Sequence, residues 1–207
     1  MDYLNKPEYA GSSHIGTREY QQDALETGES VFGAVFGVLC DGMGGMEDGG
    51  LASRTATLSM AQAFNEMDPE GDIPEFLVRQ AKLTNQVIYQ MPVNKDDYGK
   101  TGTTLAAVVI CGSHLYWLSI GDSRIYIIRQ DEIVSVAPDH SYALELAQQV
   151  RLGNITAEEA ASDPQKEALI SFLGMEELAL MDINPNAFIL NSGDIILLCS
   201  DGLYKSL

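Results

Sequence analysis

The chain has 207 residues, and 12 Lys and Arg stand against 30 Asp and Glu, which gives a formal net charge of −18 at pH 7 and a pI of about 4.3. So acidic a chain offers no basic face to a nucleic acid or to an anionic membrane surface, and neither is expected as a partner. Hydrophobic residues make up 45% of the sequence, which is typical of a folded domain with a buried core. We therefore expect one domain spanning residues 1–207.

The amino-terminal residues lack the basic and apolar regions of a secretory signal, and no run in the sequence reaches the ~18 apolar residues that a membrane span requires. Cys40, Cys111 and Cys199 are scattered along the chain and form no C-x-x-C pair. An odd, dispersed set of cysteines is typical of reduced, buried side chains. These features together predict a cytoplasmic protein.

In chain order, the first strong strand signal is the apolar run at residues 31–40, which is long enough for a strand buried on both faces. Two helices are expected next. One begins near Leu51, and the other begins near Pro74, with Asp72 before it and apolar residues recurring at helical spacing in both.

The second half of the chain reads mostly as strands in hairpins, with a helical segment inserted between them. The predicted strands are residues 103–111, 115–120, 124–129, 132–136, 187–190 and 194–200, and the predicted helical stretches are 141–150, 157–161 and 165–172. This order of elements predicts an α+β fold with antiparallel sheets whose faces are covered.

Two of the predicted strands end in nearly the same residues, VLC-Asp41-Gly42 and LLCS-Asp201-Gly202. Each places a carboxylate at the carboxyl end of an apolar strand. If the strands meet at one edge, the two carboxylates repel each other, and a divalent cation with oxygen ligands is the usual compensation. Either Asp-Gly pair alone would be explained by turn formation, but the matched pair favours a metal site.

Two further motifs carry charged side chains near apolar strands: Gly16-Thr17-Arg18-Glu19-Tyr20-Gln21-Gln22-Asp23, and Ser119-Ile120-Gly121-Asp122-Ser123-Arg124. Taken singly, the first is compatible with a surface ion pair between Arg18 and Asp23, and the second with a common hairpin turn. The three histidines are too dispersed for a zinc site.

Taken together and in order, GTREYQQDA, VLCDGMGG, TGTTLAAVV, LSIGDSRIY, PDHSYALEL and LLCSDGL resemble the metal-dependent protein phosphatases of the PP2C or PPM class, and the Met after Asp41-Gly42 is similar to the bacterial branch. The resemblance extends from Gly16 to Gly202. It implies a β-sandwich of two antiparallel sheets flanked by helices in an α-β-β-α arrangement. It also implies that phosphoserine and phosphothreonine proteins, the products of a Ser/Thr kinase, are hydrolysed by a metal-activated water.

The resemblance also implies roles for individual residues. Asp41, the carbonyl of Gly42 and Asp201 would hold two Mn²⁺ or Mg²⁺ ions, which are hard cations that prefer oxygen ligands. Arg18 would bind the phosphate with its planar guanidinium group, and Asp23 would hold metal-bound water. Asp122 matches the position of a third, weaker metal. Residues 140–175 would form a flap over the cleft.

The sequence departs from the family pattern in three places. Gln21 stands where the family usually has Asn, Ser162-Asp163-Pro164 replaces a His-Pro in the flap, and no His follows Asp41-Gly42 to protonate the leaving oxygen. The closing helix, final strands and Asp-Asn motif of the family are not among these 207 residues. We therefore expect weaker metal binding and exposed sheet edges that favour self-association. A relative that binds a phosphoprotein or regulatory partner with weak or no catalysis is the alternative.

Overall fold

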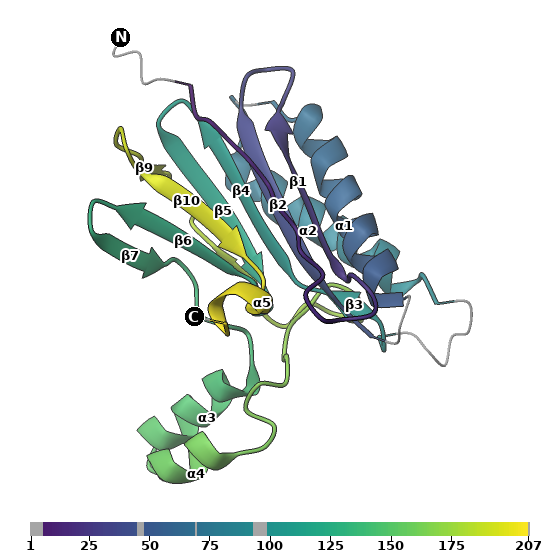
Figure 1. Ribbon diagram of the computed structural model, residues 1–207, viewed down its shortest axis with the longest axis vertical. Coiled ribbons are helices and arrows are strands. Elements are labelled where there is room, and N and C mark those ends of the chain that lie inside the picture. Colours follow the sequence, from purple (N-terminus) through teal and green to yellow (C-terminus); the bar gives the residue numbers. More distant parts are fainter. Residues whose placement is uncertain (1–5, 45–47, 69, 93–98, 207) are drawn as a thin grey trace.

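The computed structural model describes residues 6–44, 48–68, 70–92 and 99–206. Within these ranges the strands form two antiparallel sheets, accompanied by helices on the outside of one sheet and by a helical segment that projects away from both (Figure 1). The predicted fold class, with its two antiparallel sheets and flanking helices, is confirmed.

The larger sheet has the strand order β1-β2-β4-β5-β8, and β3 pairs with β2 while β9 pairs with β5. Its strands are β1 (Asp23–Glu29), β2 (Val35–Met43), β3 (Gly102–Thr103), β4 (Leu105–Cys111), β5 (His114–Ile120), β8 (Asp182–Ile183) and β9 (Phe188–Ile189). The smaller sheet has the order β10-β6-β7. Its strands are β6 (Arg124–Arg129), β7 (Glu132–Ser135) and β10 (Ile195–Cys199).

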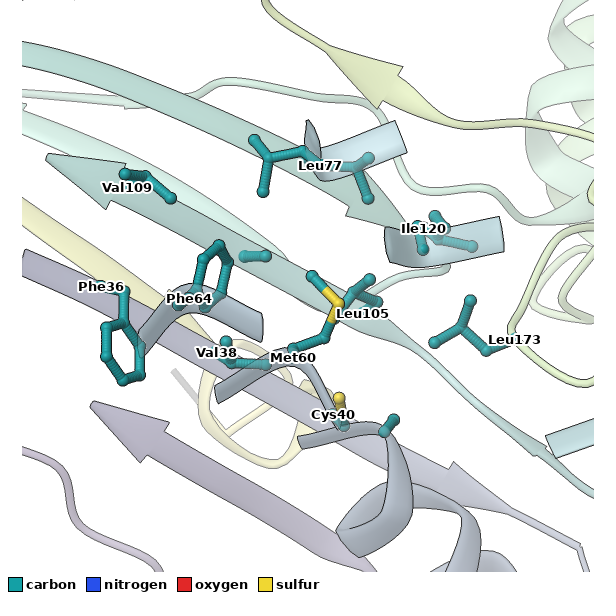
Figure 2. Close-up of a cluster of buried hydrophobic side chains, with 14 of the residues drawn as sticks. Phe36, Val38, Cys40, Met60, Phe64, Leu77, Leu105, Val109, Ile120 and Leu173 are labelled. Atoms are coloured by element: carbon teal, nitrogen blue, oxygen red, sulfur yellow. The ribbon is translucent and has the colours of Figure 1, made fainter. Parts of the chain in front are cut away.

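Two long helices, α1 (Asp48–Asn65) and α2 (Ile73–Tyr89), cover the outer face of the larger sheet. Along α1, Ala52, Ala56, Met60 and Phe64 recur every fourth residue and are buried, so they form one apolar stripe against the sheet. Phe64 stacks on Phe36 of β2 with ring centroids 5.2 Å apart. Figure 2 shows this core, in which α1 residues meet side chains from β2 and β4.

A second apolar cluster lies between the two sheets. It contains Val35 and Val108 from the larger sheet and Ile125 and Ile127 from β6, with Trp117 packed against them. The chain therefore buries the larger sheet on both faces, which explains why β4 is an uninterrupted apolar run. The fourth, helical layer implied by the family resemblance is not seen outside β6 and β7 in the described ranges, and Ile133 on β7 is exposed.

The strand predicted at residues 31–40 begins and ends later in the structure, as β2. Residues 30–34 form a tight turn in which the Ser30 amide donates to the Ala34 carbonyl oxygen at 2.8 Å, and Gly33 has a φ of +85°. The strand therefore starts at Val35 and continues through Asp41 and Gly42 to Met43. Its hairpin partner β1 was missed, because the sequence DALETGE has no apolar run to mark an edge strand.

The predicted helix at residues 165–172 is wrong. Two inserted helices do form, α3 (Tyr142–Arg151) and α4 (Ala157–Ser162), and they project from the sheets within residues 140–175, the segment named the flap in the sequence analysis (Figure 1). Residues 164–167 instead form turns, and the main chain beyond them bonds to other segments. Leu169 bridges to Ser141 and Leu173 bridges to Thr103. These long-range pairings outweigh the helical propensity of the segment.

None of the helices in the described ranges is both long enough and apolar enough to cross a membrane.

Candidate metal centre

Asp41 and Asp23 face each other across the hairpin of β1 and β2, where they are paired in register at the end of the ladder. This register was not predictable, because β1 itself had not been expected. The pairing brings together two carboxylates that lie 18 positions apart in the sequence. It also places Asp23 beside β10, since the Ser200 hydroxyl donates to the Asp23 carboxylate at 2.8 Å.

The main chain of Asp41 is held by two threonines of the TGTT motif. Its amide donates to the Thr104 hydroxyl at 2.8 Å, and its carbonyl oxygen accepts from the Thr104 amide and the Thr103 hydroxyl, each at 2.9 Å. The next residue, Gly42, lies so close to the start of α1 that a Cβ atom would stand 2.1 Å from the Gly49 carbonyl oxygen. Only glycine fits this contact between backbone segments.

The carboxylate of Asp41 lies in a strongly acidic environment. Burial, followed by the negative charges of Asp23 and Asp201, a hydrogen bond with Asp23 and the charge of Asp122, raises its pKa to about 8. The pKa of Asp122 is also raised, by burial first and by the charge of Asp201 second. Asp23, Asp122 and Asp201, from three other motifs, are therefore close enough to Asp41 to oppose its ionisation, which is the condition that a bound cation relieves.

Asp201 begins the short helix α5 (Asp201–Tyr204) at the end of β10. Its carboxylate lies 3.9 Å from the Arg18 guanidinium and 3.1 Å from the Lys205 ammonium group. Lys205 also lies 3.2 Å from Glu167 of the flap. Arg18 therefore lies beside the acidic cluster. Its ion pair is with Asp201, whereas the sequence suggested an ion pair with Asp23.

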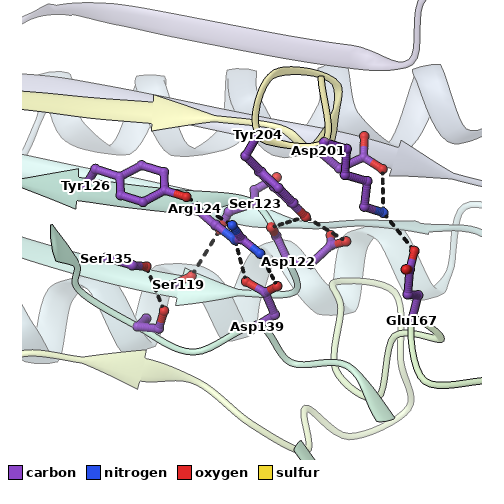
Figure 3. Close-up of polar contacts among 12 residues, drawn as sticks. Ser119, Asp122, Ser123, Arg124, Tyr126, Ser135, Asp139, Glu167, Asp201 and Tyr204 are labelled. Carbon is purple, nitrogen blue, oxygen red and sulfur yellow. Dashed lines mark hydrogen bonds and ion pairs between the residues drawn. The ribbon is translucent and has the colours of Figure 1, made fainter. Parts of the chain in front are cut away.

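Asp122 occupies the turn between β5 and β6, after Gly121, whose φ is +99°. The Tyr204 hydroxyl lies 3.1 Å from the Asp122 carbonyl oxygen and 3.3 Å from its carboxylate (Figure 3). The neighbouring Arg124 makes a bidentate ion pair with Asp139, in which Nε donates to Oδ1 at 2.9 Å and Nη2 donates to Oδ2 at 2.8 Å. The Asp122 turn is therefore attached both to α5 and to the start of the flap.

His140 is the one fully buried histidine in the described part of the chain, and it supports the Asp122 turn from behind. Its Nδ1 accepts from the Gly121 amide at 3.2 Å, and its Nε2 lies 2.7 Å from Asp182. Because Nδ1 is the acceptor, the proton resides on Nε2 and is donated to the Asp182 carboxylate. His140 therefore links the Asp122 turn to Asp182.

A divalent cation is compatible with this donor set. All four acidic side chains offer oxygen, which Mg²⁺ and Mn²⁺ prefer, and burial together with the neighbouring carboxylates raises the pKa of Asp41, an effect that a nearby cation would offset. In the described residues no three His, Cys, Asp or Glu side chains are yet arranged around a single point. Arg18 and Lys205 lie against Asp201 in this arrangement.

Several residues around the candidate centre were missed by the sequence analysis. Thr103 and Thr104 hold the main chain of Asp41, Ser200 holds Asp23, and Tyr204 contacts Asp122. Thr103, Thr104 and Ser200 belong to the motifs TGTT and LCSDGL, and Tyr204 follows the second directly, but a motif does not show which atoms meet. Gly45, noted beside Asp41-Gly42, lies outside the described residues.

A groove of about 1370 Å³ adjoins the candidate centre. Its lining includes Arg18, Asp23 and Asp201 together with apolar side chains of both sheets, among them Val108 and Leu198. The extended segment at residues 6–18 forms another part of its wall. The charged residues of the candidate centre are thus open to solvent from this groove.

Comparison with known proteins agrees with the geometry. Residues 10–207 match the family model described as protein phosphatase 2C. Protein phosphatase PhpP of Streptococcus pneumoniae is 33% identical over 190 residues, which cover 90% of this chain and 74% of that protein. The solved serine/threonine phosphatase of S. agalactiae is 33% identical, with a TM-score of 0.80, and the match covers 92% of this chain and 77% of that one.

A further solved structure shows the catalytic domain of the serine/threonine protein phosphatase PstP in complex with two manganese ions. It is 29% identical to this chain, with a TM-score of 0.69, over 92% of this chain and 75% of that domain. The match to the family model covers the segments that carry Arg18, Asp41 and Asp201. This chain belongs to the protein phosphatase 2C family.

Proposed function

We propose that this protein hydrolyses phosphoserine and phosphothreonine in phosphoproteins, with two Mn²⁺ or Mg²⁺ ions held by Asp41, the Gly42 carbonyl and Asp201. The observation that carries the proposal is the convergence of four carboxylates, which raises the pKa of Asp41 to about 8. The two manganese ions in the PstP relative support the choice of metal.

Bound divalent cations would acidify a water molecule and neutralise charge on the phosphoryl group. The residues of the chain supply the remaining functions. Asp23 would orient water at the centre, and Asp122 would hold a third, weaker ion. Arg18, whose side chain is 59% exposed, is free to turn from Asp201 toward a phosphate, which its planar fork can bind at two oxygens.

The alternative proposal, a domain that binds phosphoproteins without hydrolysing them, lacks a supporting observation, because Arg18, Asp23, Asp41, Asp122 and Asp201 are all present. Release of phosphate from a phosphothreonine peptide by the 207-residue protein, measured with Mn²⁺, with Mg²⁺ and with a chelator, tests both. Metal-dependent turnover supports the phosphatase. Peptide binding with no turnover at any metal concentration supports the alternative.

The variant Asp41→Asn links this activity to the candidate centre. It should lower turnover and Mn²⁺ affinity at least about 100-fold, because loss of an outer partner of a metal site alone costs about 10–100-fold. Asp131→Asn is the matched control, since Asp131 is an exposed aspartate at the tip of the β6–β7 hairpin. Equal activity of the two variants would contradict the assignment of Asp41.

A further inference from the structure

Tyr204 connects two of the proposed metal-binding carboxylates. It lies on α5, three residues after Asp201, and its hydroxyl is within hydrogen-bonding distance of both the carbonyl and the carboxylate of Asp122. Asp122 itself belongs to a different segment, the turn between β5 and β6, 82 positions away. One side chain therefore spans the distance between the Asp122 turn and the helix that begins at Asp201 (Figure 3).

The ring of Tyr204 is held in place by its neighbours. The guanidinium carbon of Arg124 lies 3.6 Å from the ring centroid, a distance at which the cation and the π face attract each other. Arg124 cannot easily turn away, because Asp139 binds its fork at two points and the Tyr126 hydroxyl accepts from it at 3.0 Å. The planar guanidinium thus fixes the plane of the Tyr204 ring and directs its hydroxyl toward Asp122.

The hydrogen bond from the Tyr204 hydroxyl restrains the Asp122 carboxylate. The turn that carries it is anchored behind by His140 through the Gly121 main chain, but the hydrogen bond to the Asp122 carboxylate comes from the Tyr204 hydroxyl. A carboxylate has lone pairs for a metal as well as for one hydroxyl, so the hydrogen bond can persist when an ion is bound.

We propose that Tyr204 is a positioning residue, which holds the Asp122 carboxylate at a fixed separation from Asp201 so that the two can share a divalent cation. The inference rests on the proposed function and deepens it. Outer partners of metal ligands commonly contribute 10–100-fold to metal affinity, and Tyr204 stands in that relation to Asp122.

The test is Mn²⁺ binding to the 207-residue protein, followed by titration calorimetry and by the electron paramagnetic resonance signal of free Mn²⁺. Tyr204→Phe keeps the ring on Arg124 and removes only the hydroxyl. Asp122→Asn identifies the bound Mn²⁺ ion that depends on Asp122. We expect Tyr204→Phe to raise the dissociation constant of that same ion about 10-fold. Tyr116→Phe is the matched control, because Tyr116 lies on β5 and packs against the core beneath the helices, away from Arg124 and Asp122, and it should leave that constant unchanged.

A double-mutant comparison separates positioning from general destabilisation. If Tyr204 acts through Asp122, Tyr204→Phe should have no further effect on Mn²⁺ binding in the Asp122→Asn background, whereas a merely structural role would add to it. Unchanged or tighter binding in Tyr204→Phe, or an equal loss in both backgrounds, overturns the inference. Tyr204→Leu repeats the test if the first variant is poorly folded, as judged by the thermal midpoint of the metal-free protein.

Failure of the underlying function gives a different result. If Asp41→Asn and Asp122→Asn both bind Mn²⁺ as the unmodified protein does, the metal assignment is wrong and the role of Tyr204 falls with it. If these two variants lose affinity while Tyr204→Phe does not, the metal centre stands and only the positioning role is rejected.

Discussion

Asp41 is held through its main chain by Thr103 and Thr104, so its carboxylate is left to the influence of its acidic neighbours. Its position in the strand is therefore set before any ion binds. A neutral Asp41 is favoured in the metal-free protein, because burial and the charges of Asp23 and Asp201 oppose its ionisation. This arrangement makes Asp41 sensitive both to pH and to added cations.

The stability of the metal-free protein should therefore depend on pH through Asp41. Its pKa of about 8 in the folded protein lies above the ordinary value of 3.8, so the folded state binds the extra proton between these values. The stabilisation is fully present below about pH 4 and is lost as the pH rises toward 8.

We expect Asp41→Asn to reduce the fall in stability between pH 5 and pH 8 by at least about 1 kcal/mol, or roughly 2–4 °C in thermal midpoint for a chain of this size. Thermal unfolding in the presence of a chelator measures it. Asp131→Asn should retain the slope of the unmodified protein. An identical slope in Asp41→Asn would show that Asp41 is ionised in the folded state at neutral pH.

Arg18 should affect substrate binding more than metal binding. Arg18 has an exposed side chain and forms an ion pair of 3.9 Å with Asp201, and such pairs contribute little to stability. Arg18→Ala should raise KM for a phosphopeptide roughly 10-fold, which corresponds to one lost charge-assisted hydrogen bond, while Mn²⁺ titrations show no weakening. Arg79→Ala, on the exposed side of α2, is the control. A lower thermal midpoint with unchanged KM would instead make Arg18 a structural residue.

At the scale of single elements, α2 shows how local signals act. Asp72 precedes the helix, its carboxylate accepts from the Glu75 amide at 2.8 Å, and Pro74 occupies the first turn. Both features were expected from the sequence, since an acidic cap and an early proline satisfy or avoid the unpaired amides at a helix start. Local signals of this kind determine the helix start without help from distant residues.

Removing this cap should cost a measurable amount of stability. Asp72→Ala is expected to lower the free energy of unfolding by about 1 kcal/mol, observed as a shift of the denaturant midpoint with an unchanged slope. Glu66→Ala is the control, because it removes a carboxylate from the same connection between helices. In the described part of the chain Glu66 is hydrogen-bonded through its main-chain amide. This control variant should be neutral, and a comparable loss in both variants would point to net charge as the cause.

At the scale of the whole molecule, the two sheets enclose a groove of about 1370 Å³ beside β10. Within the described residues β10 pairs with β6 along one side only. Ile195 on this strand is 58% exposed. An unpaired apolar edge next to an apolar groove is a site at which another strand can add.

We therefore expect the 207-residue protein to self-associate as its concentration rises, which sedimentation velocity would detect. Ile195→Lys should shift the protein toward the monomer, because a charge on an edge strand opposes further pairing. Ile133→Lys changes an equally exposed isoleucine on β7, at the opposite edge of the same sheet, and should leave the association unchanged. A monomer at all concentrations, or equal effects of both variants, would contradict the role of β10.

Much of this protein can be predicted from its sequence. The strand Arg124–Arg129 follows from hydrophobic periodicity and the start of α2 from its local cap, and six ordered motifs indicate the family and the candidate residues Arg18, Asp41 and Asp201. These features depend on residues that are near one another in the chain, so the sequence alone carries them.

The tertiary structure decided the rest, because the deciding contacts join residues far apart in the chain. The register that sets Asp23 opposite Asp41 required a strand with no apolar signal of its own. The attachment of Asp122 to Tyr204 spans 82 positions. Residues 165–172 carry a helical pattern. No helix forms there, because Leu169 bridges to Ser141 and Leu173 bridges to Thr103. In each case the energy of a long-range pairing exceeds a weak local preference, and no local pattern records it.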